Sequence, residues 1–154
     1  MKLKHLVLFI VPVFFLFSCN DEEESLPPVP SLEEEVLTEI NAHRAQRGLS
    51  ALEMNNTLRN LARGHSEKMA LEGDDPDHAG FEARVEEIRA ELGNGSVAEN
   101  VASGGGDVTA IVQLWIDSEG HKDNIEGSYD LTGIGVVKDE EGRHFYTQIF
   151  FNQP

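Results

Sequence analysis

The strongest hydrophobic pattern of the chain lies within residues 98–127 and predicts an amphipathic helix. Apolar residues recur there at the i, i+3, i+4 and i+7 spacing of a helix with one buried face. These residues are Val108, Ile111, Val112 and Trp115. Asp107 is placed to cap the start of this helix, and Gly120 is placed to end it. Glu99 and His121 therefore flank a rigid element, where side chains are well placed to line a cleft.

Three other segments have the periodicity of helices. They span about residues 32–46, 55–72 and 81–92. The first has a cap at Ser31 or Leu32 and a stop at Gly48, and its glutamates, Glu33 included, are expected on the solvent side. Asn41 lies close to the apolar side of this helix. We expect it to bond a loop backbone and assign it no ligand role.

His65 lies in the middle of the apolar face of the second predicted helix. A single histidine in such a position is more often a core residue with satisfied hydrogen bonds than a catalyst, so we expect a structural role. Ser66 points elsewhere on a helix, so the two residues do not form a nucleophile and its base. The following segment, 73–80, is rich in aspartate but lacks the glycine and distal glutamate of an EF-hand loop. It predicts a solvated acidic loop.

Two C-terminal segments, 131–137 and 144–151, are separated by a charged turn and predict a hairpin. Their apolar residues fall on both alternating faces, which is typical of strands in a sheet that is covered on both sides. A further strand is predicted at 96–102, before a glycine triplet that lacks the residues of a phosphate-binding loop. With helices before and between these strands, we expect an α+β fold, a three-layer α/β/α sandwich around a small antiparallel sheet.

The first 18 residues predict a signal peptide. Lys2 and Lys4 precede an apolar run that is too short to span a membrane as a folded helix. The run leads to Cys19, the only cysteine of the chain, in a sequence that resembles the lipobox of a bacterial lipoprotein. We interpret Cys19 as a lipid attachment point, so that acyl chains rather than a span anchor the protein to a membrane.

Residues 19–32 are acidic and rich in proline, which predicts a tether and leaves residues 33–154 as one domain. The acidic run after Cys19 also resembles the signal that sends lipoproteins to the outer surface in some Gram-negative lineages, while a soluble spacer is the simpler interpretation. The chain has 12 basic and 28 acidic residues, and removal of the signal peptide removes two lysines. The mature chain then has 10 basic and 28 acidic residues, which gives a formal charge of −18. Such a surface repels phosphate backbones, so we exclude nucleic acid as a partner.

Motifs spread over the chain match those of a known family. They are AENVA at 98–102, the W-x-x-S-x-G-H-x-x-N-I run at 115–125, and TGIGV at 132–136 followed by YTQIF at 146–150. In these motifs the chain resembles the CAP family, also called the SCP or PR-1-like family, in its bacterial form. The match covers roughly residues 33–151 in order, and it implies the same sandwich fold.

The resemblance also implies a cleft with two histidines and two glutamates. His78, Glu99 and His121 match three of these positions in order, and His78 precedes an F-x-x-R segment as it does in bacterial members. The fourth position is open. Where animal members have a glutamate this chain has Ser118, and Glu119, one residue later, takes its place if the helix end unwinds.

Two imidazoles with one or two carboxylates are a reasonable set for Zn²⁺ or another divalent cation, and equally for general acid–base chemistry on a polarised water. His78 and His121 are the predicted metal ligands, and Glu99 and Glu119 are the candidate catalytic residues. The alternative is structural: Glu99 and Asn100 tie the strand to neighbouring loops, and His121 caps a short turn.

These residues leave two functions of different class open, besides a structural module of the envelope. The first is a cell-envelope lipoprotein whose extracytoplasmic domain binds a ligand or a partner protein in the His/Glu cleft. The second is a divalent-metal-dependent hydrolase, a peptidase or an envelope-acting enzyme, with Glu99 as base and the histidines as ligands. Both place the protein at a bacterial membrane through its lipid anchor, with the outer membrane or cell surface as an option.

Overall fold

The structure, a computed structural model, describes residues 30–73 and 75–153. The predicted signal peptide, Cys19 and most of the tether lie outside the described residues. Within the two described ranges, no helix combines the length and the apolar character that a membrane crossing needs.

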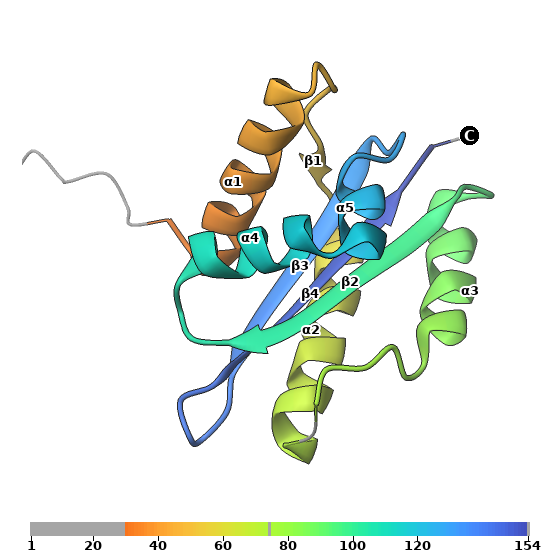
Figure 1. The fold of residues 1–154 in the computed structure, drawn as a ribbon. Helices are drawn as coiled ribbons and strands as arrows, with labels where there is room; N and C mark the ends of the chain where they lie inside the picture. Colours follow the sequence, from red (N-terminus) through yellow and green to blue (C-terminus); the bar gives the residue numbers. More distant parts are fainter. Residues whose placement is uncertain (1–29, 74, 154) are drawn as a thin grey trace, which may run out of the picture.

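Five helices and four strands follow one another along the described residues (Figure 1). Their order is α1 (Leu32–Gln46), β1 (Glu53–Met54), α2 (Asn56–Glu72), α3 (Phe81–Leu92), β2 (Val97–Gly104), α4 (Val108–Asp117), α5 (Glu119–Ile125), β3 (Leu131–Lys138) and β4 (His144–Phe151). Side chains cap three of the helices. Ser31 begins α1 with a capping box and Asp107 begins α4, as predicted, and Asn55, expected inside the second helix, caps the start of α2.

The four strands form one sheet in the order β1-β3-β4-β2. The predicted hairpin is confirmed, since β3 and β4 pair antiparallel, and β2 pairs antiparallel with the other side of β4. β1, which the sequence pattern does not predict, adds two residues parallel to β3, so the sheet is mixed. β2 therefore forms an edge of the sheet, and Glu99 lies on this edge strand.

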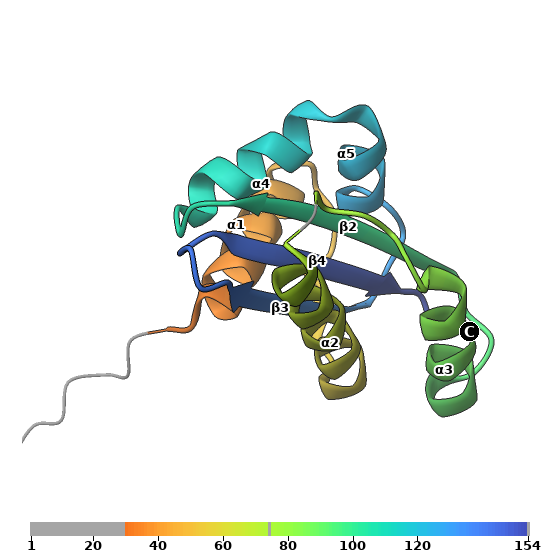
Figure 2. The same cartoon turned by 90° about the horizontal axis from the view of Figure 1, so that it is seen from below.

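Helices cover both faces of the sheet, with α1, α4 and α5 on one face and α2 and α3 on the other (Figure 2). The side chains of β4 alternate between these two layers. Tyr146 and Phe150 pack under α1 and α4, whereas Ile149 and Phe151 pack under α2 and α3. The three-layer sandwich predicted from the two-sided apolar strands is therefore confirmed.

The glycines of the TGIGV motif allow α2 to lie directly on β3. A Cβ atom at Gly133 would collide with the backbone of Leu58, and one at Gly135 would collide with the backbone of Arg63. Glycine is required at such positions because any side chain would separate the two backbones. The motif thus reflects helix–sheet packing.

Asn41 and Arg44 attach α1 to neighbouring loops. Asn41 exchanges two hydrogen bonds with the backbone of Leu52, at 3.0 and 2.8 Å, which agrees with the structural role expected for it. Arg44 is buried and donates to the carbonyl oxygens of Ser50, Ile125, Gly127 and Tyr129.

Two sequence predictions about helices are wrong. The helix that begins after Asp107 ends at Asp117, Ser118 is extended, and Gly120 lies inside α5 instead of ending α4. Glu33 is not on the solvent side, because it precedes Val36 by three residues on the buried face of α1. Its side chain is 4% exposed and pairs with Arg63.

Candidate functional site

Glu99 and Asn100 are consecutive residues of the edge strand, so their side chains face opposite helical layers. Val101 packs against Met69 of α2, which places Glu99 on the same side, toward α2 and α3. The Asn100 Nδ2 donates to the carbonyl oxygen of His121 in α5, at 3.0 Å. This part of β2 therefore connects both layers at the edge of the sheet.

The carboxylate of Glu99 is the centre of a polar cluster that we call the Glu99 cluster: His65, His78, Arg84 and Glu99. The Glu99 side chain is 1% exposed. Arg84 donates from Nε to Oε2 and from Nη2 to Oε1, both at 2.8 Å. The Nδ1 of His78 lies 2.9 Å from Oε1. A buried carboxylate is costly without such partners, and α3 and the loop before it supply them.

His65 closes the cluster from α2. Its Nε2 lies 2.8 Å from the carbonyl oxygen of Asp77 and 4.0 Å from the Glu99 Oε1. A carbonyl oxygen only accepts, so Nε2 carries the proton. Burial lowers the pKa of His65; the Asp77 carbonyl opposes this shift, and the charge of Arg84 adds to it. The buried ring with a backbone partner agrees with the structural role expected for this histidine.

His78 lies beside Glu99 on the α2 and α3 side of β2, whereas His121 lies in α5 on the other side. His78 is 51% exposed, whereas His121 is partly buried in α5. Burial lowers the pKa of His121, and the charge of His78 lowers it further, so the two imidazoles lie within electrostatic range. The His121 Nδ1 is buried and has no hydrogen-bond partner among the described residues. Asn124 holds α5 on β2 by donating to the Asn100 side chain at 2.9 Å.

The predicted site residues are thus brought together in part. His78 contacts Glu99, and His121 lies near His78 but on the other face of the strand. Glu119 is exposed in the first turn of α5, and within the described chain it makes no hydrogen bond or ion pair. A carboxylate there suits the helix N-terminus. Its role as the second glutamate stays a prediction.

The Glu99 cluster does not fit a divalent metal as it is arranged. Both Glu99 oxygens accept from Arg84, and His65 already has a carbonyl partner. Among residues 30–73 and 75–153, no three His, Cys, Asp or Glu side chains converge on a metal position. A general base must also reach the proton that it takes, and the paired, buried Glu99 is poorly placed to do so. The ligand roles of His78 and His121 stay predictions.

Arg84 is the residue of this cluster to which the sequence assigns no role beyond the F-x-x-R resemblance. A signal for it exists, because Glu99 lies within an apolar strand and a buried carboxylate needs a cationic partner. A basic residue in the first turns of the helix after His78 is a natural choice. Its selection over other basic residues depends on how α3 packs beside β2.

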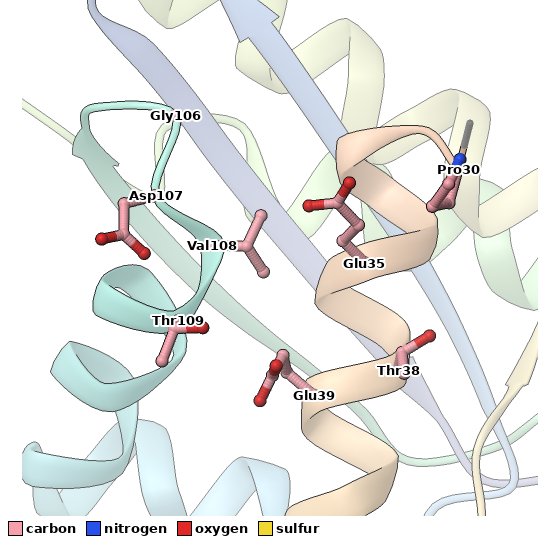
Figure 3. A pocket seen from close by; sticks show the side chains of 8 residues that line it. All are labelled: Pro30, Glu35, Thr38, Glu39, Gly106, Asp107, Val108 and Thr109. Carbon is pink, nitrogen blue, oxygen red and sulfur yellow. The ribbon is translucent and has the colours of Figure 1, made fainter.

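Five cavities of about 170 to 550 Å³ on the described part of the chain are lined by other residues. Figure 3 shows one of about 370 Å³, where Glu35 and Glu39 of α1 face Asp107 and Thr109 across the gap to α4. Burial raises the pKa of Tyr146, and the charges of Asp107 and Glu35 raise it further. The potential here is negative, but this cavity is separate from the predicted site residues.

The layer order, the sheet and the AEN edge strand define a CAP-type domain. Residues 37–150 match the family described as CAP, the cysteine-rich secretory protein family, and the chain belongs to this family. The resemblance that the motifs indicate is therefore confirmed.

Three proteins that are similar to this chain come from bacteria. An outer surface protein of Borrelia burgdorferi is 20% identical with a TM-score of 0.70, over 80% of this chain and 93% of that one. An extracellular SCP-domain protein of Bacillus anthracis is 24% identical with a TM-score of 0.68, and the match covers 84% of this chain and 45% of that one. These two share the fold. The uncharacterized membrane protein YlbC of Bacillus subtilis is 33% identical over 125 residues, 79% of this chain. The chain spans only 34% of that relative's length.

Proposed function

We propose that this protein is a lipid-anchored, extracytoplasmic CAP domain that binds a ligand or partner protein with the surface formed by His78 and His121. The predicted signal peptide and the lipobox-like sequence at Cys19 support this location. The names of the fold relatives, an outer surface protein and an extracellular protein, are consistent with it. The acidic tether would separate the domain from the anchor, and the acidic surface would keep it from anionic headgroups.

The pairing of Glu99 with Arg84 is the observation that favours binding over hydrolysis. Arg84 takes both carboxylate oxygens, so Glu99, the predicted base of the hydrolase, is neither free nor accessible. The same pair holds His78 through Nδ1 and leaves the other ring nitrogen available at the half-exposed surface. Side chains that are already held in place lose little entropy on binding, which favours a recognition surface.

The charges around this surface restrict the class of ligand. Arg84 is neutralised by Glu99, and the lowered pKa values of His65 and His121 favour neutral rings at neutral pH. Recognition would then depend on hydrogen bonds rather than on positive charge, and the chain as a whole is strongly acidic. We expect a neutral or cationic ligand, or a basic partner surface.

The binding surface is tested by pull-down from envelope extracts with the wild type and the His78→Ala/His121→Ala double variant. His43→Ala is the matched control. His43 lies on α1, away from the proposed surface, and its Nε2 also lies 2.8 Å from a glutamate, Glu126. A partner that the wild type and the control retain and the double variant loses supports the proposal. Equal recovery by all three proteins contradicts it.

The location is tested separately by metabolic labelling with a fatty-acid analogue. The wild type should be labelled and recovered with membranes, and Cys19→Ala should be unlabelled. Labelling that persists in Cys19→Ala, or its absence from the wild type, argues against the anchor.

A further inference from the structure

We propose that Arg84 is the resident cation of the Glu99 cluster, in the position that a divalent metal would take, and that its removal converts the cluster into a metal site. The proposal concerns how Glu99 is neutralised. It therefore holds whether or not the His78 and His121 surface binds a ligand.

The donor atoms around Glu99 are of the types that bind zinc and are close to the necessary spacing. His78 Nδ1 and His65 Nε2 lie 2.9 and 4.0 Å from the Glu99 Oε1. Two ligand atoms at 2.0–2.1 Å from a tetrahedral zinc ion are about 3.3 Å apart, a value between these two distances. Each of these two distances therefore differs by less than about 1 Å from the separation of two zinc ligands.

Arg84 satisfies the Glu99 carboxylate as a bound cation would. Its two hydrogen bonds of 2.8 Å are the bidentate pairing that guanidinium forms with carboxylate, and its side chain is only 11% exposed. A second cation on the same buried carboxylate would lie close to the guanidinium, where repulsion is weakly screened. Arg84 and a metal therefore exclude each other at Glu99.

The same guanidinium also holds the loop that carries His78. Its Nη1 donates to the carbonyl oxygen of Ala79, the residue after His78, at 2.9 Å. The neighbouring carbonyl, that of Asp77, occupies the Nε2 of His65. Loss of Arg84 would release the Ala79 attachment, leave the Glu99 Oε2 without its donor and leave Oε1 with His78 alone. His65, His78 and Glu99 could then shift toward a shared ion.

The experiment is a zinc titration of the untagged mature protein and of Arg84→Ala by calorimetry, with thermal unfolding at each zinc concentration. We expect Arg84→Ala to bind one zinc per chain at least tenfold more tightly than the wild type and to gain thermal stability with zinc. Arg84→Ala/His78→Ala should return to the wild-type affinity. Arg63→Ala is the matched control, because it removes the other bidentate arginine, that of Glu33, and should gain no zinc affinity.

Three results would overturn the proposal. One is stoichiometric zinc in the wild type that His78→Ala abolishes, which would instead support the metal-dependent hydrolase. Another is a folded Arg84→Ala without a gain in affinity. If Arg84→Ala does not fold by itself, refolding is attempted with zinc and with millimolar guanidinium. Recovery by either cation supports a cation position at Glu99, and recovery by neither rejects it.

Discussion

Glu33 and Glu99 are two buried glutamates that are each held by a bidentate arginine, but they differ in their surroundings. Glu33 on α1 meets Arg63 of α2 at 2.5 and 2.6 Å, and the Arg63 side chain is 50% exposed. Arg84, in contrast, is 11% exposed, and two histidines also face Glu99.

This difference shows that burial of a carboxylate is not by itself a sign of function. One arginine is sufficient to bury Glu33 as a link between helices. The Glu99 cluster contains more polar groups than such a link requires, and one of them, His78, is half exposed. The additional imidazoles, rather than the buried charge, distinguish the candidate site.

The largest expected effect is on stability when each arginine is removed. Arg84→Ala should lower the free energy of unfolding by about 3–5 kcal/mol, because it leaves a buried charge without its partner. Arg63→Ala should cost about 1–2 kcal/mol, since water reaches the half-exposed end of that pair. Urea unfolding of both variants measures the difference. Equal losses of stability would mean that the Glu33–Arg63 and Glu99–Arg84 pairs are equivalent, which would contradict the difference drawn between them.

The second expected effect is a dependence of stability on pH that arises at two partly or fully buried histidines, His65 and His121. The pKa values of His65 and His121 are lowered, chiefly by burial, from the ordinary value near 6.5. Between the lowered and the ordinary pKa the unfolded chain binds more protons than the folded one. Stability is therefore full above about pH 6.5 and falls as the pH drops below it.

Denaturant unfolding at pH 7.5 and 5.5 measures this dependence. His121→Gln should reduce the loss of stability at pH 5.5, because the substituted side chain does not titrate. Glu33→Gln is the control that weakens the domain without a change of histidine, and it should lower stability by a similar amount at both pH values. If the pH dependence of stability is unchanged in His121→Gln, His121 is not one of its sources.

The smallest expected effect is that of His78→Ala on stability. The imidazole is half exposed and Arg84 already satisfies Glu99, so the loss should be no more than about 1 kcal/mol. Thermal unfolding measures it. A loss as large as that of Arg84→Ala would show that His78 is a structural part of the cluster and would remove the reason to treat it as a recognition residue.

Local pattern was sufficient to predict most elements of the fold. The periodicity and the caps predict α1 at its observed bounds and α3 at its observed bounds, because these signals lie within a few residues of each helix end. The failures involve distant partners. Glu33 is buried by an arginine 30 positions away, and β1 exists only because Glu53 and Met54 pair with β3.

The candidate site likewise has residues that local motifs predict and residues that depend on distant partners. His78, Glu99 and His121 could be selected from motifs, and His78 and Glu99 do meet. The role of Arg84 could not be predicted with them, since guanidinium groups are common and only the packing of α3 beside β2 brings this one to Glu99. The position of Glu119 depended on a helix break at Ser118 that periodicity does not reveal.

The amino-acid sequence by itself determined four of the helices, the hairpin, the two-sided sheet and the family, because these depend on periodicity, caps and short motifs. Only the tertiary structure decided which charges neutralise each other. The free energy of a buried carboxylate depends on the groups within a few ångströms of it, and those groups come from α2, α3 and the loop between them. Whether Glu99 faces a metal, a substrate or an arginine is therefore a property of packing.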